Sequence, residues 1–158
     1  AAFVAGCSER VFDIYVGLCF AYNPVVWDSI ELIWKYAQSG EMHAEIHRSA
    51  MGRLERVIEP YVEDQESIYG AIFAVMTALE SVSADDALLA ERVALVASGA
   101  VDRTDRGKFG ASVEEDDWQV QWLQSCVDHD PERARDEFER LNPTKPQWLA
   151  RWEGNVSS

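Results

Sequence analysis

Apolar residues recur every three or four positions along most of the chain, which is the spacing of one face of an α-helix. In residues 3–22, further apolar side chains fill the other sides of the predicted helix. A helix that is apolar on most sides belongs in the middle of a domain. We therefore predict a buried first helix over residues 3–22, whose main stripe comprises Phe3, Cys7, Val11, Ile14, Leu18 and Tyr22.

Three breaks follow in the first half of the chain. Asn23 and Pro24 end one helix and begin another, because asparagine caps helices and proline is tolerated at the first helical position. Ser39 and Gly40 end the second helix. A third helix stops near Pro60, and its apolar stripe comprises Ala50, Leu54, Val57 and Ile58.

The second half has the same helical character. Residues 67–82 are almost free of charge and rich in small side chains, which predicts a buried helix that its neighbours approach closely. Ser83, Asp85 and Asp86 predict the start of a fifth helix that runs to about Asp102. A loop is expected at residues 103–112, where two glycines lie.

Three further helices are expected after this loop. Ser112 caps the first, Pro131 begins one that runs to about Leu141, and a short final helix holds Trp148 and Trp152. No stretch alternates with a period of two residues, and no repeat is present. We predict an all-α fold, with residues 1–158 as a single domain and a bundle of about six to eight helices.

The charge of the chain narrows the class of partner. Its 28 acidic residues against 14 Lys and Arg give a formal net charge of -14. Such a surface repels nucleic acid and anionic membranes, and it favours encounter with a basic protein. Solubility alone is the alternative explanation of the acidity.

The longest uncharged runs are shorter than the ~20 residues of a membrane span. We read Cys7, Cys19 and Cys126 as reduced core thiols of a cytoplasmic protein.

No motif in the sequence specifies a reaction or a cofactor. His43 and His47 are spaced like two metal ligands, but Glu45 is not directly after the first His, as a zinc protease requires. No third ligand is visible, and both histidines continue the stripe of the third helix. We predict no metal site, no bound cofactor and no enzymatic activity.

The stretch "VEEDDWQVQW", residues 113–122, concentrates acids and tryptophans. Ser112 as cap and Glu115 as its capping-box partner explain part of the acidity. Between residues 112 and 130, however, there are six acids and no Lys or Arg. We predict that Trp118 and Trp122 are buried. The opposite side, with Val120, Leu123 and Val127, must then meet another helix or a partner.

Two acidic segments are candidate partner-binding surfaces. The first comprises Glu114, Glu115, Asp116, Asp117, Asp128 and Asp130. The second is the acidic loop after the third helix, with Glu59, Glu63, Asp64 and Glu66.

Several segments together resemble the YjaG-like family of bacterial proteins, a domain of unknown function. They are "FVAGCSERVFDIY", "IELIW", "SIYGAIFAVMTALESV" and "VEEDDWQVQW", which span most of residues 2–127 in the family's order. Glu9 and Arg10 match the family's opening, whereas Ser8 replaces a cysteine, Asp13 a proline and Met76 an acidic residue. The resemblance implies an all-helical cytoplasmic protein and supplies no catalytic residues.

These observations favour a non-catalytic acidic binding protein, best represented by an immunity protein that neutralises a basic bacterial toxin, such as a nuclease. Two alternatives stay open. One is an enzyme or small-molecule-binding protein with a pocket near Glu9, Arg10, His43 and His47. The other is a housekeeping helical domain whose acidity has no specific partner.

Overall fold

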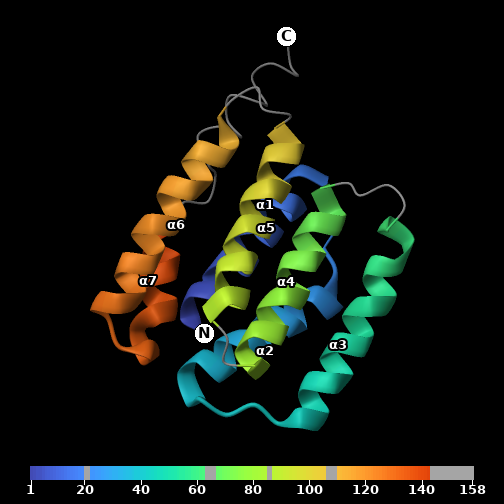
Figure 1. Ribbon diagram of the computed structural model, residues 1–158, viewed down its shortest axis with the longest axis horizontal. Coiled ribbons are helices and arrows are strands. Elements are labelled where there is room, and N and C mark those ends of the chain that lie inside the picture. The colour runs from blue at the N-terminus through green and yellow to red at the C-terminus, as the bar shows by residue number, and fades with distance from the viewer. Residues whose placement is uncertain (20–21, 63–66, 85–86, 106–109, 143–158) are drawn as a thin grey trace.

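The computed structural model describes residues 1–19, 22–62, 67–84, 87–105 and 110–142. Within them the chain forms seven α-helices and two single-turn 3₁₀ helices, and no strand (Figure 1). This confirms the predicted all-α bundle. The elements are α1 (Ala2–Cys19), α2 (Pro24–Ser39), α3 (Ala44–Ile58), η1 (Glu59–Tyr61), α4 (Ser67–Ala84), α5 (Ala87–Asp105), α6 (Ala111–Asp128), η2 (Pro131–Arg133) and α7 (Ala134–Leu141).

Both ends of α2 follow from local chemistry. The Asn23 side chain accepts a hydrogen bond from the Val25 N–H at 3.0 Å, and Pro24 occupies the first helical position. At the other end Gly40 adopts a left-handed conformation with φ 70° and donates its N–H to the Tyr36 carbonyl. Glycine tolerates this conformation because it has no Cβ. The predicted boundaries of α2 are confirmed.

Other boundaries differ from the prediction. Ser83 lies in the last turn of α4 and not at the start of α5, and α5 continues to Asp105, beyond the predicted end at Asp102. Some predicted features fall outside the described residues: Asp85, Asp86, residues 106–109 of the predicted loop, and the final helix with Trp148 and Trp152.

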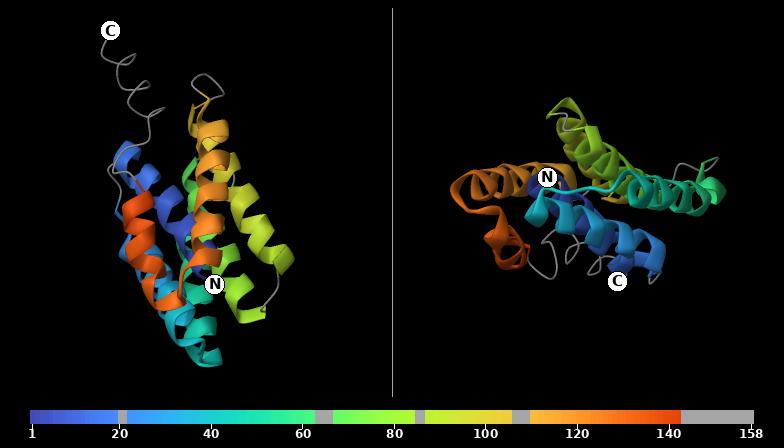
Figure 2. Two further views of the ribbon diagram at one scale, coloured as in Figure 1. Left: turned by 90° about the vertical axis from the view of Figure 1, so that its left-hand side faces the viewer. Right: turned by 90° about the horizontal axis from the view of Figure 1, so that it is seen from below.

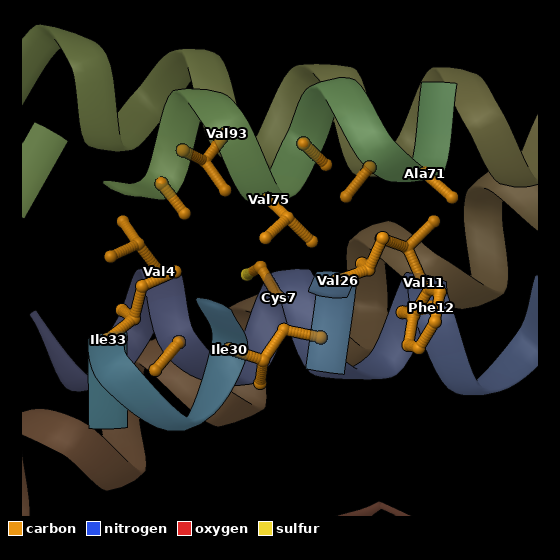
Figure 3. Close-up of a cluster of buried hydrophobic side chains, with 14 of the residues drawn as sticks. Val4, Cys7, Val11, Phe12, Val26, Ile30, Ile33, Ala71, Val75 and Val93 are labelled. Atoms are coloured by element: carbon orange, nitrogen blue, oxygen red, sulfur yellow. The ribbon is translucent and has the colours of Figure 1, made fainter. Parts of the chain in front are cut away.

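Helix α1 occupies the centre of the bundle. It packs against α2, α4, α5, α6 and α7, as a helix with apolar residues on most sides should. On one side its core side chains meet those of α2, α4 and α5 (Figure 3). The buried residues shown there include Val4, Cys7, Val11 and Phe12 of α1, Val26, Ile30 and Ile33 of α2, Ala71 and Val75 of α4, and Val93 of α5.

Helices α6 and α7 cover another side of α1. Helix α6 also packs on α5, its neighbour in Figure 2, left, and α7 packs on α6. Arg135 of α7 forms a two-pronged ion pair with Glu31 of α2, whose Nη1–Oε2 distance is 2.8 Å, and this pair ties α7 to the bundle. Helix α3 lies at the opposite edge, against α2 and α4. One side of α6 therefore faces the core and another faces outward.

Candidate functional site

Helix α6 begins differently from the prediction. It starts at Ala111 after Gly110, which has φ 74° and makes no side-chain cap. The carboxylate of Asp105, at the end of α5, accepts the hydrogen bond of the Ala111 N–H at 3.0 Å. Ser112 is thus inside the first turn and is not the N-cap. The side chain of Asp105, six residues before Ala111, thus takes the capping role that the sequence predicted for Ser112.

Glu115 is a core residue and does not belong to a solvent-facing acidic surface. Its carboxylate is fully buried and accepts the Nε–H of Arg10, on α1, at 2.7 Å. Gln119 donates to its other oxygen at 3.3 Å. A buried carboxylate is stable only when it is paired and hydrogen-bonded, and Arg10 supplies that partner. Glu115 must therefore be removed from the predicted partner-binding set.

Arg10 joins three helices through a single guanidinium. Besides Glu115 of α6, its Nη1 donates to the side-chain oxygen of Asn142, just after α7, at 2.8 Å. Its Cζ lies 4.4 Å from the centroid of the Trp118 ring, within the range of a cation–π contact. Arg10 is itself almost completely buried. These contacts fix the rotation of α6 about its own axis, and so determine which of its residues face solvent.

The two tryptophans of α6 complete its inner face. Trp118 and Trp122 are both buried, as predicted. They pack with Trp34 of α2 and Phe138 of α7 in an aromatic cluster whose ring centroids are 5.6–6.3 Å apart. The indole N–H of Trp122 donates to the Phe3 carbonyl at 3.1 Å, so the polar edge of this ring is satisfied as well.

Glu9 is a second buried carboxylate close to this cluster. It accepts the indole N–H of Trp34, and burial raises its pKa from 4.5 to about 7 despite that hydrogen bond. Burial also raises the pKa of Asp13 to about 6, although Asp13 remains exposed enough for solvent to screen its charge. A carboxyl group that titrates near neutrality is a feature of functional sites and of buried structural networks alike.

The outward side of α6 carries a different set of acids. Asp116, Asp117 and Asp128 of α6 are exposed, as is Asp130 just after the helix, and Glu114 is partly buried. We call the four exposed residues the outer acids. Asp116 accepts a hydrogen bond from the Ser98 hydroxyl of α5 at 2.8 Å. In the second predicted surface Glu59 is exposed, while Glu63, Asp64 and Glu66 lie outside the described residues.

Exposed apolar side chains accompany the outer acids. Val120, Leu123 and Val127, which the sequence placed opposite the tryptophans, are exposed, and so is Val113. Leu88 and Leu95 on α5 are also exposed. These two leucines were not predicted from the sequence, although their spacing of seven residues could have singled them out. Among the described residues, α6 thus has no second helix over its outer side.

The predicted pocket around Glu9, Arg10, His43 and His47 is not assembled. Glu9 and Arg10 point to α2, α6 and α7, whereas His43 and His47 belong to α3, which packs on α2 and α4. A shallow hollow beside α2 includes none of these four residues; it is lined by Lys35, Gln38, Ser39 and Glu132.

The remaining candidates for chemistry are metal ligands and thiols. Among the described residues, no three His, Cys, Asp or Glu side chains gather as metal ligands. Cys7 and Cys126 are free thiols whose pKa burial raises, to about 12 for Cys126, so both are protonated at neutral pH and are poor nucleophiles. In the part of the chain that is described, no helix has the length and apolar character needed to cross a bilayer.

No protein-family model, curated protein or solved structure matches this chain. The resemblance to the YjaG-like family therefore stays a prediction.

Proposed function

We propose that this protein is a non-catalytic binding protein, an immunity protein that captures and neutralises a basic bacterial toxin. The observation that carries the proposal is the outward side of α6. Of the six acids between residues 112 and 130, only Glu115 is withdrawn into the core, and no Lys or Arg stands among them. Helix capping does not account for Asp116 and Asp117, because Asp105 supplies the cap at the start of α6.

A nuclease is the toxin class that this surface fits best. An enzyme that binds a polyanionic substrate presents basic residues around its active site. A row of carboxylates can occupy the same positive field, and the net charge of -14 accelerates the encounter. Neutralisation would then follow from covering the active site, without any chemistry on the part of the inhibitor.

The packing of the inner face of α6 supports this role. Arg10 and the aromatic cluster hold its inner face, so the backbone that carries Asp116, Asp117 and Asp128 is positioned before a partner arrives. A preorganised surface loses less conformational entropy on binding than a mobile one. The buried Arg10–Glu115 pair therefore serves the proposed function indirectly, through the orientation of the helix.

The test is protection of a host cell. The gene next to that of this protein would be expressed alone and together with it. We expect growth arrest in the first case and rescue in the second. Asp116→Asn/Asp117→Asn should weaken rescue, whereas Glu45→Gln/Glu55→Gln, which removes the same charge from exposed positions on α3, should not. A neighbouring product that is harmless, or that does not bind this protein, would contradict the proposal.

A further inference from the structure

The exposed apolar side chains of the described residues are concentrated on two helices. Nine large hydrophobic residues are exposed in the described part of the chain, and three of them, Tyr22, Ile46 and Val62, lie outside α5 and α6. The remaining six are Leu88 and Leu95 of α5 and Val113, Val120, Leu123 and Val127 of α6. Single exposed apolar residues are common on soluble proteins, but a gathered set marks an interaction site.

These six residues lie on the same side of the α5–α6 pair. Two hydrogen bonds locate the line of contact between the helices: Gln119 to the Ala94 carbonyl at 3.1 Å, and Ser98 to Asp116 at 2.8 Å. Leu95 follows Ala94 and Val120 follows Gln119, in each case on the side turned away from the core. The two helices are antiparallel neighbours (Figure 2, left). In such a pair, the residue that follows a contact residue points to the same face of the pair on both helices, so Leu95 and Val120 share one outward face. We call these six residues the α5–α6 face.

The spacing along each helix matches the seam of a helix–helix contact. Val113, Val120 and Val127 are seven residues apart, as are Leu88 and Leu95. Apolar residues at this spacing form a straight stripe against which another helix can pack. Their exposure is high, 67% for Leu95, 69% for Val120 and 73% for Val127.

The charge around the α5–α6 face determines what can cover it. The outer acids border it on α6 and just after its end, and α6 itself contains no Lys or Arg. Both arginines of α5 turn toward α4: Arg92 lies 5.5 Å from the Phe73 ring centroid, and Arg103 Nη2 comes within 2.6 Å of where a Cβ on Gly70 would be. A second copy of this chain would bring acids against acids, which disfavours pairing.

We infer that the α5–α6 face binds an amphipathic basic helix of the partner protein. The apolar side of that helix packs on Leu95, Val120 and Val127, and its Lys and Arg residues pair with the outer acids. This inference rests on the proposed function and adds the chemistry of the element that is recognised. The apolar stripe provides the buried contact, while the acids provide orientation and speed of association.

A synthetic peptide can test this inference without knowledge of the natural partner. The probe is a fluorescently labelled helix of 18 residues, the length of α6, with Leu on one side and Lys on the others. Its binding to the full chain is followed by fluorescence anisotropy. We expect it to bind at least about tenfold more tightly than a peptide of the same composition in scrambled order, and than one with Glu in place of Lys. Equal binding of either control peptide would overturn the inference.

Matched variants then locate the bound peptide. Val120→Ser/Val127→Ser should weaken binding at least about tenfold. Ile46→Ser/Val62→Ser, which changes two exposed apolar residues elsewhere, should leave it within about twofold. The reverse pattern would place the site elsewhere. A lower melting temperature in the first variant only would show that its own chain covers this face, and a dimer in sedimentation would show that a second copy does; either result overturns the inference.

The same variants separate this inference from the proposed function. If the neighbouring toxin is neutralised equally well by Val120→Ser/Val127→Ser and by the unchanged protein, the inference fails and the proposed function stands. If no toxin is neutralised but the peptide results are as expected, the face binds basic helices and the proposed function fails.

Discussion

The two sides of α6 carry the same kinds of residue with opposite consequences. On the inner side Glu115 is buried against Arg10, and Trp118 and Trp122 fill the aromatic cluster. On the outer side Asp116 and Asp117 stand in solvent, beside exposed valines. The comparison shows that composition alone does not assign an acidic or apolar residue to stability or to binding. The rotation of the helix about its axis decides which residues face the core and which face solvent, and buried contacts determine that rotation.

The largest difference in stability should come from truncating one apolar residue on each side of α6. Trp122→Ala should lower the free energy of unfolding by about 3–5 kcal/mol, because the fully buried indole contacts Trp34, Trp118 and Phe138. Val120→Ala, two residues earlier on the outer side, should change it by less than about 0.5 kcal/mol. Urea unfolding of both variants checks this, and similar losses would refute the division between the sides.

The buried side should also respond to pH. Because burial raises the pKa of Glu9 from 4.5 to about 7, the folded protein binds more protons than the unfolded chain between these values. Stability should therefore fall as pH rises through this window, by up to about 3 kcal/mol. Glu9→Gln, which keeps an oxygen for the Trp34 N–H, should flatten the profile. A profile from pH 5 to pH 8 that is the same in both proteins would contradict the assignment to Glu9.

The close packing of α1 against α6 predicts a smaller change in stability. A Cβ on Gly6 of α1 would lie 2.3 Å from Nε1 of Trp122, so Gly6→Ala should destabilise by about 1–3 kcal/mol. Gly52 in α3 has open space around it, and Gly52→Ala should stabilise by about 0.5–1 kcal/mol. Thermal melting of the two variants should move in opposite directions. A stabilising Gly6→Ala would mean that α1 and α6 are packed less tightly than described.

The outer acids should have the smallest effect on stability and the largest on association. Asp116→Asn/Asp117→Asn should alter the free energy of unfolding by less than about 1 kcal/mol. It should slow association with a basic partner and flatten the dependence of the rate on salt, as stopped-flow measurements at low and high ionic strength can show. If the variant melts early while its association rate is unchanged, these acids serve only the helix.

Much of the fold could be predicted because its signals are local. Apolar periodicity defined the helices, Asn23, Pro24 and Gly40 marked the ends of α2, and the stripe of Trp118 and Trp122 indicated burial. These depend on residues within a few turns of one another, which a sequence displays directly.

What the sequence could not show depends on distant pairs. Glu115 looked like one more surface acid, since its partner Arg10 is 105 positions away. Asp105, the last residue of α5, caps α6 in place of Ser112, because its carboxylate lies at the start of α6. The α5–α6 face also needed the structure, because its two stripes come from separate helices.

Neighbouring acids on α6 provide the most direct test of its two sides. Glu115→Gln and Asp117→Asn each remove one negative charge with little change in shape, at positions two residues apart. In urea unfolding at neutral pH we predict a loss of about 3 kcal/mol or more for Glu115→Gln, because Arg10 keeps a buried charge without its counterpart. Asp117→Asn should stay within about 1 kcal/mol of the unchanged protein. Equal effects of the two substitutions would contradict the claim that one side of α6 holds the fold and the other is available for binding.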